Sequence, residues 1–484
     1  MIIVFVLYLA AVLVIAFISS RRAKTLSSFV LGDKKISGLS LALSERATGE
    51  SAWLLLGLTG EAFLIGMQAL WIALGCVIGI AFIWFVMGNR LRLETERTGA
   101  LTVSSLLSRK FPGAERTIGT LSASIVVFFF TFYIAAQFSG GGLILHDTFG
   151  IDPVWGIIIG SIVVTFYCMI GGFMSVVATD VFQAVLMIFT LIVLPIVILF
   201  TAAANNIHIM ETIQNADPVY SSLTADKTGA AAVLLIMSGM SWAFGYTGQP
   251  QLLTRMMAIK NERDVKTAKW VAIIWTLFAY SGAMIIGFAG FAFLKGGLLG
   301  AEEAKLAKDF EKILPVMINL MIAPVLAGFL LSGAISAMMS TASSEIILGS
   351  SSIVEDIYGN FSKRKITPEK SLYLNKVLTV AVGAVAFVLA LSERDTVYGL
   401  VSYAWSGIGS SFGPALLLLL FWKKISRAGV IASLISGTVG TVIWKNWILI
   451  PTGVSERLGS FVFAFLLAVV FSLLIPEKKT AEHA

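Results

Sequence analysis

The chain has 484 residues, of which 57% are hydrophobic and 13% are charged, with a formal net charge of +7. A typical soluble domain is about 45–50% apolar and about 25% charged, and here the apolar excess extends over the whole length. These values exclude a soluble enzyme with one membrane anchor and predict an all-α integral membrane protein. Cys76 and Cys168 lie in apolar stretches and offer neither a disulfide framework nor a metal motif.

The first segment, 2–20, is apolar and lacks both a basic start and a small-residue cleavage site, so we expect a membrane span there and no cleaved signal. A membrane helix needs about 20 apolar residues. On this criterion the sequence predicts about 13 transmembrane helices, at 2–20, 39–66, 67–87, 117–145, 153–173, 176–203, 230–254, 267–294, 314–348, 372–391, 396–421, 428–448 and 458–475.

Lys and Arg gather on alternate sides of this arrangement, at 21–35, 90–116, 255–269, 363–370, 423–427 and 478–479. Because cytoplasmic loops are enriched in Lys and Arg, we expect the N-terminus outside and the C-terminus in the cytoplasm of a cell inner (plasma) membrane. The loop 204–229 and the amphipathic segment 297–313 are then external.

Two spans are interrupted by polar or flexible residues. Residues 44–53 read SERATGESAW, and residues 241–250 read SWAFGYTGQP, with two glycines and a proline that favour unwinding. These are spans 2 and 7, five apart, which is the pattern of an inverted five-helix repeat whose binding site lies at the breaks. We therefore divide the chain into 1–38 (first helix and loop), 39–203 and 230–421 (the two repeats), 204–229 (external loop) and 422–484 (two C-terminal helices and a short tail).

The segment 336–345 carries an unusual run of oxygen-bearing side chains inside an apolar stretch: Ser336, Ser340, Thr341, Ser343, Ser344 and Glu345. Polar side chains within a membrane mark cavities or ion paths, and hard cations take oxygen ligands. Asp180 is a second signal, because an unpaired carboxylate in lipid costs at least about 2.5–3.5 kcal/mol. We favour a cation or proton site at Asp180 over a structural salt bridge.

No Walker, dinucleotide or zinc motif is present in the sequence, so energy for transport has to come from an ion gradient. The three histidines lie in loops or the tail and form no catalytic cluster, and broken helices in both halves argue against a channel. We expect neither an enzyme nor a nucleic-acid partner. A transporter-like sensor would need a signalling domain, and only about nine residues follow the last span.

Residues 328–358, GFLLSGAISAMMSTASSEIILGSSSIVEDIY, resemble the signature of the sodium/solute symporter family. Similar stretches occur at 51–58, 179–183, 245–250, 399–405, 412–414 and 444–445, so the resemblance covers nearly the whole chain. It is closer still to the bacterial members that take up proline. The resemblance implies a LeuT-like fold with thirteen helices, alternating access and Na⁺ as the co-transported ion.

The resemblance also implies site residues. For one sodium these are the carbonyls of Ala47, Glu50 and Ala337 and the hydroxyls of Ser340 and Thr341; for a second sodium, found in some relatives, they are Asp180, Ser340, Thr341, Ser343 and Ser344. A substrate such as L-proline would contact Ser51, Ala52, Trp242, Tyr246 and Pro250, with Tyr133 as a further contact. Other amino acids, pantothenate, sialic acid and sugars are alternative solutes. We expect the protein to function as a monomer in the bilayer.

The chain departs from the family pattern in the broken second span and at Glu345, which replaces an amide. Gly49 stands where proline-transporting members have an aspartate that matters for coupling, and Glu50 follows it. Arg46 either neutralises Glu45 or Glu50, or its guanidinium substitutes for the ion; alternatively, Glu50 carries a proton. We favour sodium coupling, with a proton-coupled or sodium-independent transporter as the alternative, and assign Arg46 and Glu345 to coupling.

Overall fold

The computed structural model describes residues 1–21, 25–361, 367–392 and 396–477, and all regular elements in these ranges are helices. Parts of the predicted basic loops (22–24 and 362–366) and the tail from 478 lie outside the described residues. The long helices are α1 (Ile2–Ser20), α3 (Gly38–Ala52), α5 (Ala69–Phe82), α8 (Glu115–Phe149), α9 (Pro153–Ala204), α12 (Gly229–Met240), α15 (Glu262–Lys295), α18 (Pro324–Ser352), α20 (Pro368–Ser392), α21 (Val397–Phe421), α22 (Arg427–Ile443) and α24 (Glu456–Leu474).

Shorter elements connect or extend these helices. The α-helical ones are α2 (Leu26–Leu31), α4 (Thr59–Ile65), α6 (Gly88–Thr98), α7 (Val103–Arg109), α10 (Ile209–Gln214), α11 (Pro218–Ser221), α13 (Trp242–Tyr246), α14 (Pro250–Met257), α16 (Glu303–Lys308), α17 (Ile313–Met321), α19 (Gly359–Phe361) and α23 (Leu449–Thr452). The 3₁₀ and π segments are η1 (Gly32–Lys34), η2 (Trp53–Leu58), η3 (Gly66–Gln68), η4 (Ile83–Met87), η5 (Gly300–Glu302), η6 (Phe310–Lys312), η7 (Ile353–Tyr358) and η8 (Trp444–Ile448).

The number of membrane spans follows from helix length. Among the described residues, eleven helical stretches are long and apolar enough to cross a membrane. Two of them, Gly38–Thr98 and Pro153–Ala204, contain 61 and 52 residues, more than twice the roughly 20 that one crossing needs. Gly66 (φ 63°, ψ −133°) and Gly172 (φ 54°, ψ −148°) redirect the chain inside them, because glycine tolerates these dihedrals. Each stretch holds two spans, and the predicted thirteen spans are confirmed.

The boundaries of two predicted spans change. The segment 314–348 is not one helix: α17 ends at Met321, and α18 begins at Pro324, which takes the first helical position where its missing N–H costs nothing. The segment 230–254 consists of α12, α13 and the beginning of α14, which also starts at a proline, Pro250. The interruption of span 7 predicted from its glycines and proline is therefore confirmed.

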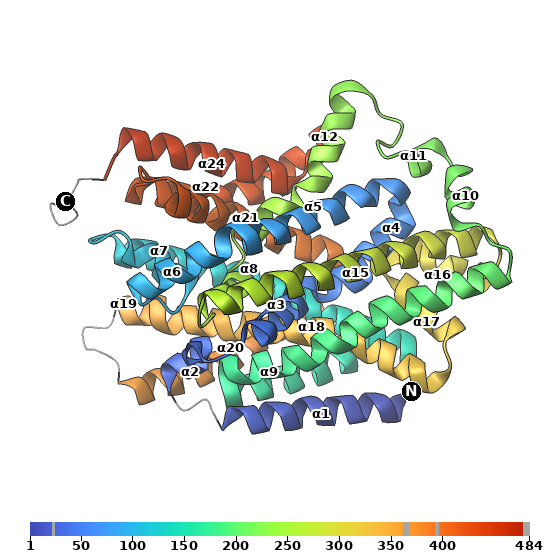
Figure 1. The fold of residues 1–484 in the computed structure, drawn as a ribbon, viewed down its shortest axis with the longest axis horizontal. Helices are drawn as coiled ribbons and strands as arrows, with labels where there is room; N and C mark the ends of the chain where they lie inside the picture. Colours follow the sequence, from blue (N-terminus) through green and yellow to red (C-terminus); the bar gives the residue numbers. More distant parts are fainter. Residues whose placement is uncertain (22–24, 362–366, 393–395, 478–484) are drawn as a thin grey trace.

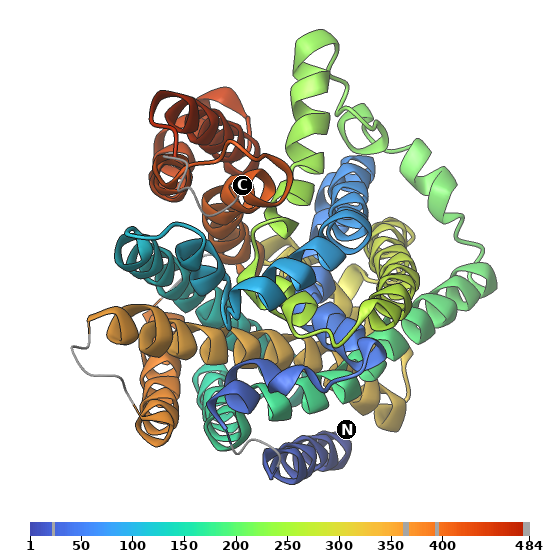
Figure 2. The same ribbon diagram turned by 60° about the vertical axis from the view of Figure 1, so that its left-hand side comes forward.

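The two repeats meet around α3 and α18, which pack against each other and against α8 and α9. Figures 1 and 2 agree in placing α1 at one edge of the molecule and the packed pair α22 and α24 at the opposite edge. This arrangement places the polar segments of α3 and α18 in the interior, although both lie in spans that composition alone assigns to lipid.

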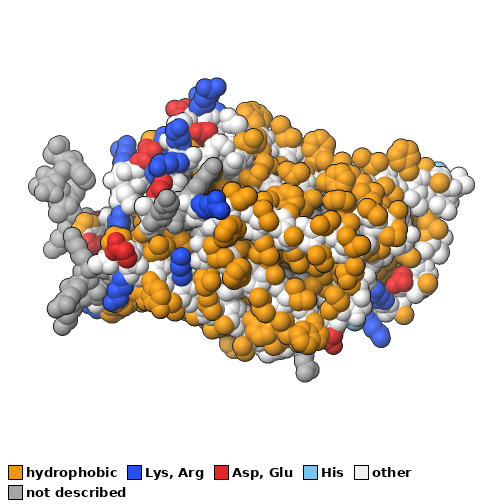
Figure 3. Space-filling view, turned by 90° about the horizontal axis from the view of Figure 1, so that it is seen from below, with side chains coloured by type: hydrophobic (Ala, Val, Ile, Leu, Met, Phe, Trp, Pro, Cys, Tyr) orange, Lys and Arg blue, Asp and Glu red, His pale blue; other side chains and the backbone are white. Residues whose placement is uncertain are grey.

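The surface matches a membrane protein. Figure 3 shows hydrophobic side chains over the broad middle of the visible face, with Lys, Arg, Asp and Glu concentrated mainly at the left-hand end. That end carries α6 and α7, which belong to one of the predicted basic loops (Figure 1). An apolar middle with charged ends is the pattern that a bilayer selects.

Candidate transport site

The break in α3 lies at Ser51, whose dihedrals (φ 40°, ψ −168°) are rarely adopted by residues other than glycine. The backbone N–H of Ala52 is thereby released and donates to the side-chain oxygen of Gln137 on α8, at 2.9 Å. The N–H of Trp53 donates to the Ser51 hydroxyl at 3.2 Å. Gln137 therefore stabilises the break, although sequence reasoning did not select it; its signal was a single amide in an apolar span.

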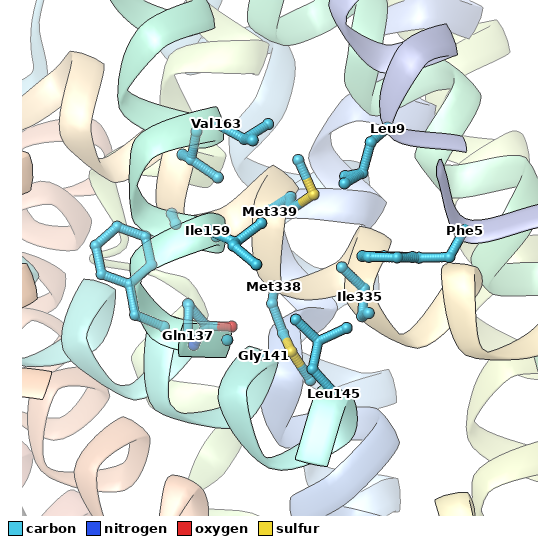
Figure 4. Close-up of a pocket in the computed structure, with 15 residues that line it drawn as sticks. Phe5, Leu9, Gln137, Gly141, Leu145, Ile159, Val163, Ile335, Met338 and Met339 are labelled. Atoms are coloured by element: carbon cyan, nitrogen blue, oxygen red, sulfur yellow. The ribbon is translucent and has the colours of Figure 1, made fainter. Parts of the chain in front are cut away.

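Gln137 also lines a small apolar crevice between α1, α8, α9 and α18 (Figure 4). Its other walls include Phe5, Ile335, Met338 and Met339. The crevice offers about 30 Å³ to water-sized molecules. This apolar lining does not suit a polar solute.

The hydroxyls of α18 meet the carbonyls of α3 directly. Ser340 donates to the Ala47 carbonyl at 2.9 Å and to the Ala337 carbonyl at 3.0 Å. Thr341 donates to the Thr48 carbonyl at 2.8 Å and also to Ala337 at 3.0 Å. Four of the five groups implied for the first sodium are thus gathered, and their oxygens suit a hard cation.

The fifth implied group is the Glu50 carbonyl, which has a partner outside this junction. The Glu50 carbonyl accepts a hydrogen bond from the N–H of Trp53, whereas the Thr48 carbonyl lies beside Thr341. The bond from Trp53 spans the break at Ser51. The Glu50 carbonyl as a sodium ligand stays a prediction, and the Thr48 carbonyl is a further oxygen beside Thr341.

Asp180 is paired, which corrects our preference for a free cation or proton site. Its carboxylate lies 3.0 Å from the guanidinium of Arg255, and both side chains are fully buried. Ser44 donates to the same carboxylate oxygen at 2.6 Å, and Arg255 also donates to the hydroxyls of Thr48 and Ser344. The guanidinium thus contacts two of the five residues implied for the second sodium, Asp180 and Ser344.

Ser343 does not join this cluster, because its hydroxyl donates to the backbone carbonyl of Ser340 at 3.0 Å. Arg255, which the sequence placed in a basic loop, lies in α14 with no exposed surface. The unwinding before Pro250 turns α14 inward, and this brings Arg255 to a carboxylate 75 positions away in the chain. The sequence signal was its position directly after an interrupted span.

Arg46 lies between two carboxylates, and the interpretation that it neutralises Glu45 or Glu50 is confirmed for both. It forms ion pairs with Glu45 and with Glu50, and all three side chains are fully buried. Trp84 donates to Glu45 at 2.9 Å and Tyr280 donates to Glu50 at 2.7 Å. The cluster is compensated by hydrogen bonds as well as charge, which is the condition for burying ions.

Glu345 has no such compensation. It is fully buried on α18, and neither carboxyl oxygen has a hydrogen-bond partner in the described part of the chain. Tyr133 on α8 interacts with it electrostatically. Its assignment to coupling stays a prediction.

Aromatic rings fill the space between the two breaks. Trp242 stacks on Trp53 with 4.5 Å between ring centroids, and Tyr246 meets Trp405 edge-on at 4.7 Å. The Tyr133 hydroxyl lies 3.3 Å from that of Ser51. Of the predicted substrate residues, the structure therefore joins Ser51 with Tyr133 and brings Trp242 and Tyr246 against a common tryptophan, Trp405. Ala52 is bound to Gln137, and Pro250 starts α14.

Comparisons with known proteins agree with this architecture. Residues 29–437 match the model of the sodium:solute symporter family. The chain is 33% identical to the "High-affinity proline transporter PutP" of Bacillus subtilis, over 96% of both chains, and 33% identical to a "Sodium/proline symporter" of Escherichia coli, over 98% of this chain and 93% of the relative.

Among solved structures, a Na⁺-coupled sialic acid symporter in a substrate-bound outward-open state superposes with a TM-score of 0.81 at 19% identity, covering 99% of this chain and 98% of the other. MhsT in complex with L-phenylalanine superposes with a TM-score of 0.55 at 15% identity, over 90% and 98% of the two chains. These likenesses concern the fold, whereas the family model and the two proline transporters cover the sequence itself. The chain belongs to the sodium:solute symporter family.

Proposed function

We propose that this protein is a secondary transporter that couples the uptake of a small solute, L-proline, to the entry of sodium by alternating access. Sodium binding is supported by the junction of α3 and α18, where the hydroxyls of Ser340 and Thr341 converge on backbone carbonyls. A sodium ion placed there would replace these hydrogen bonds with oxygen ligands and tie the two helices together.

The proposed binding of the solute rests on the helix breaks at Ser51 and before Pro250. The flat rings of Trp242 and Tyr246 suit a pyrrolidine ring, and a freed N–H such as that of Ala52 suits a carboxylate. Relatives of similar length are named proline transporters, which supports proline over pantothenate, sialic acid or a sugar.

Uptake of labelled L-proline into proteoliposomes, with a sodium gradient, a proton gradient or neither, tests the proposal. We expect uptake above equilibrium only with sodium. Equal uptake without sodium would refute the coupling, and accumulation driven by protons would favour the alternative in which Glu50 or Glu345 carries the coupling ion.

Two variants test the residues. Ser340→Ala with Thr341→Ala should raise the sodium concentration for half-maximal uptake by about tenfold for each ~1.4 kcal/mol of lost ion binding, with expression near normal. Trp242→Ala should weaken proline more than sodium. If both variants behave like the wild type, the assignment of these residues is wrong.

We further propose that the protein works as a monomer in the plasma membrane, with the N-terminus outside and the C-terminus in the cytoplasm. The alternation of basic loops supports this orientation. Both native cysteines are buried, so single cysteines introduced at exposed positions such as Ile2 and Asn206 can be labelled in intact cells against a low background. Both should react with an impermeant reagent; protection of both would reverse the orientation.

A further inference from the structure

A cavity away from the transport site lies between the end of α1, the segment of α2 and η1, the start of α3 and one side of α9. It offers about 660 Å³ to water-sized molecules, within the range of cavities that hold small ligands. None of the residues implied as ion or solute contacts lines it. We call it the peripheral cavity; its lining includes Arg21, Asp33, Lys35, Ser40, Met174 and Val181.

The peripheral cavity lies toward one end of the molecule. Figure 1 shows α2, and the end of α1 remote from the N-terminus, in the half of the molecule that carries α6 and α7. The basic loops assign this end to the cytoplasm. At the cytoplasmic end of a span, basic side chains meet the anionic headgroups of the inner leaflet.

The polar side of the cavity carries more positive than negative charge. Arg21 and Lys35 line it, and neither side chain has an ion-pair or hydrogen-bond partner in the described part of the chain. The Arg21 guanidinium lies 5.5 Å from the centroid of the Phe17 ring. Asp33 is the carboxylate of the lining, and the Thr25 hydroxyl donates to it at 3.4 Å. Two cations against one carboxylate match a ligand with a single negative charge, and both cations can bind a phosphate group.

The opposite side of the cavity is an apolar stripe on α9. Met174, Ala178 and Val181 line it, and their spacing of four and three residues places them on one face of the helix. The same face continues beyond the cavity to Val185 and Phe189, which are 53% and 41% exposed. In a chain that spans a bilayer, such an exposed apolar stripe lies against acyl chains.

A phospholipid matches both sides of the cavity, whereas a free anion matches one. Inorganic phosphate would neutralise the two cations but would leave the stripe on α9 uncovered. A lipid with a phosphate group places its charge beside the cations and its acyl chain along the stripe, and burial of that apolar surface adds to the attraction.

We propose that the peripheral cavity binds one anionic phospholipid of the cytoplasmic leaflet. Its phosphate lies between Arg21 and Lys35, a hydroxyl of its headgroup donates to Asp33, and an acyl chain follows the stripe on α9. Because α3 contributes Ser40 to the lining and continues to the break at Ser51, the lipid joins α1 to the helix that carries the ion site. The proposal needs neither proline nor sodium and therefore stands apart from the proposed function.

Native mass spectrometry of the purified full-length protein, with added phosphatidylglycerol or phosphatidylcholine of identical acyl chains, tests the proposal. We expect the wild type to bind one phosphatidylglycerol about tenfold more tightly than phosphatidylcholine. Arg21→Gln with Lys35→Gln should abolish this preference. Neither side chain forms an ion pair or a hydrogen bond within the described ranges, so the variant should fold. Equal binding of the two lipids by the wild type, or an unchanged preference in the variant, would overturn the proposal.

A matched variant separates the cavity from the total charge of the protein. Lys260→Gln with Lys424→Gln removes the same charge from two exposed lysines of other basic loops, and it should keep the preference for phosphatidylglycerol. Loss of the preference in this variant would mean that the lipid follows net charge, and the cavity would not be the site.

Water-soluble competitors separate the lipid from a free phosphate. Inorganic phosphate and glycerophosphoglycerol, which is the same headgroup without acyl chains, should leave phosphatidylglycerol bound when present in excess. Displacement by either competitor would show that the cations bind the phosphate group alone and would overturn the lipid site.

Discussion

The guanidinium of Arg255 lies 3.0 Å from the carboxylate of Asp180, and neither side chain has any exposed surface. The pair joins α14, the segment after the break of the second repeat, to α9 of the first repeat. Arg255 also donates to the hydroxyls of Ser344 on α18 and Thr48 on α3, and these two hydroxyls share a hydrogen bond. One ion pair therefore connects four helices, and it does so with a fixed charge where some relatives are expected to use sodium.

Asp180→Asn should destabilise the protein more than most single substitutions. Removing one partner of a buried ion pair leaves the other charge without compensation, at a cost of about 3–5 kcal/mol. Asp180→Asn combined with Arg255→Met should recover part of this loss, because no unpaired charge remains. Thermal unfolding in nanodiscs measures both. A double variant less stable than Asp180→Asn would contradict this account.

The same pair predicts a simple sodium dependence. Because the Arg255 guanidinium is bound to Asp180 and Ser344, two of the residues implied for the second sodium, we expect a single ion, held by the oxygens around Ser340 and Thr341. Initial rates of proline uptake should then rise with sodium along a hyperbola, without cooperativity. Arg255→Met, if it folds, frees Asp180 for a second ion and should make the curve sigmoidal. A sigmoidal wild-type curve would contradict the prediction.

The number of spans and both breaks could be predicted from the sequence because they depend on local composition. The polar run around Ser51 and the glycines before Pro250 leave a signal within ten residues. The signal for the partner of Asp180 was ambiguous: Arg255 directly follows an interrupted span, but a basic residue at the end of an apolar stretch is normally a cytoplasmic anchor. Its burial depends on the inward turn of α14, which only the tertiary packing decides.

Gln137 is a second residue whose role at the break could not be predicted from the sequence. The sequence predicts freed backbone groups at the break, and one of them, the N–H of Ala52, is already bound by the Gln137 amide. Nothing in the sequence relates these two positions, which are 85 residues apart. The candidate solute carboxylate therefore has a competitor within the chain.

Gln137→Ala should lower the stability of the protein without solute and increase the stabilisation that proline provides. Without the amide the buried N–H of Ala52 is unpaired, at a cost of about 1–3 kcal/mol, and a bound carboxylate can recover it. We expect a lower unfolding temperature without proline and a larger upward shift with saturating proline.

Gln183→Ala is the matched control for this measurement. Gln183 is a buried glutamine on α9 that donates to the Tyr8 hydroxyl, away from the break. Its replacement should lower stability without enlarging the shift caused by proline. Equal shifts in Gln137→Ala and in the wild type would show that Ala52 does not bind the solute.

Glu311 predicts a pH dependence of stability. It lies in η6, outside the membrane helices, and accepts hydrogen bonds from the N–H groups of Tyr398 (2.7 Å) and Val397 (3.0 Å) at the start of α21. Burial raises the pKa of Glu311 from 4.5 to about 7, although these two N–H groups lower it; the charges of Asp309 and Glu61 add to the rise.

A carboxyl with a higher pKa in the folded than in the unfolded protein binds its proton more tightly when folded. Its contribution to stability is therefore fully present below about pH 4.5 and is lost as the pH rises through about 7. Over that interval the contribution falls by roughly 3 kcal/mol. Glu311→Gln removes the titration, so the variant should lose less stability than the wild type between these pH values, and Glu303→Gln should behave like the wild type. Parallel pH profiles for Glu311→Gln and the wild type would mean that Glu311 is ionised in the folded protein throughout, with α21 held by the charge.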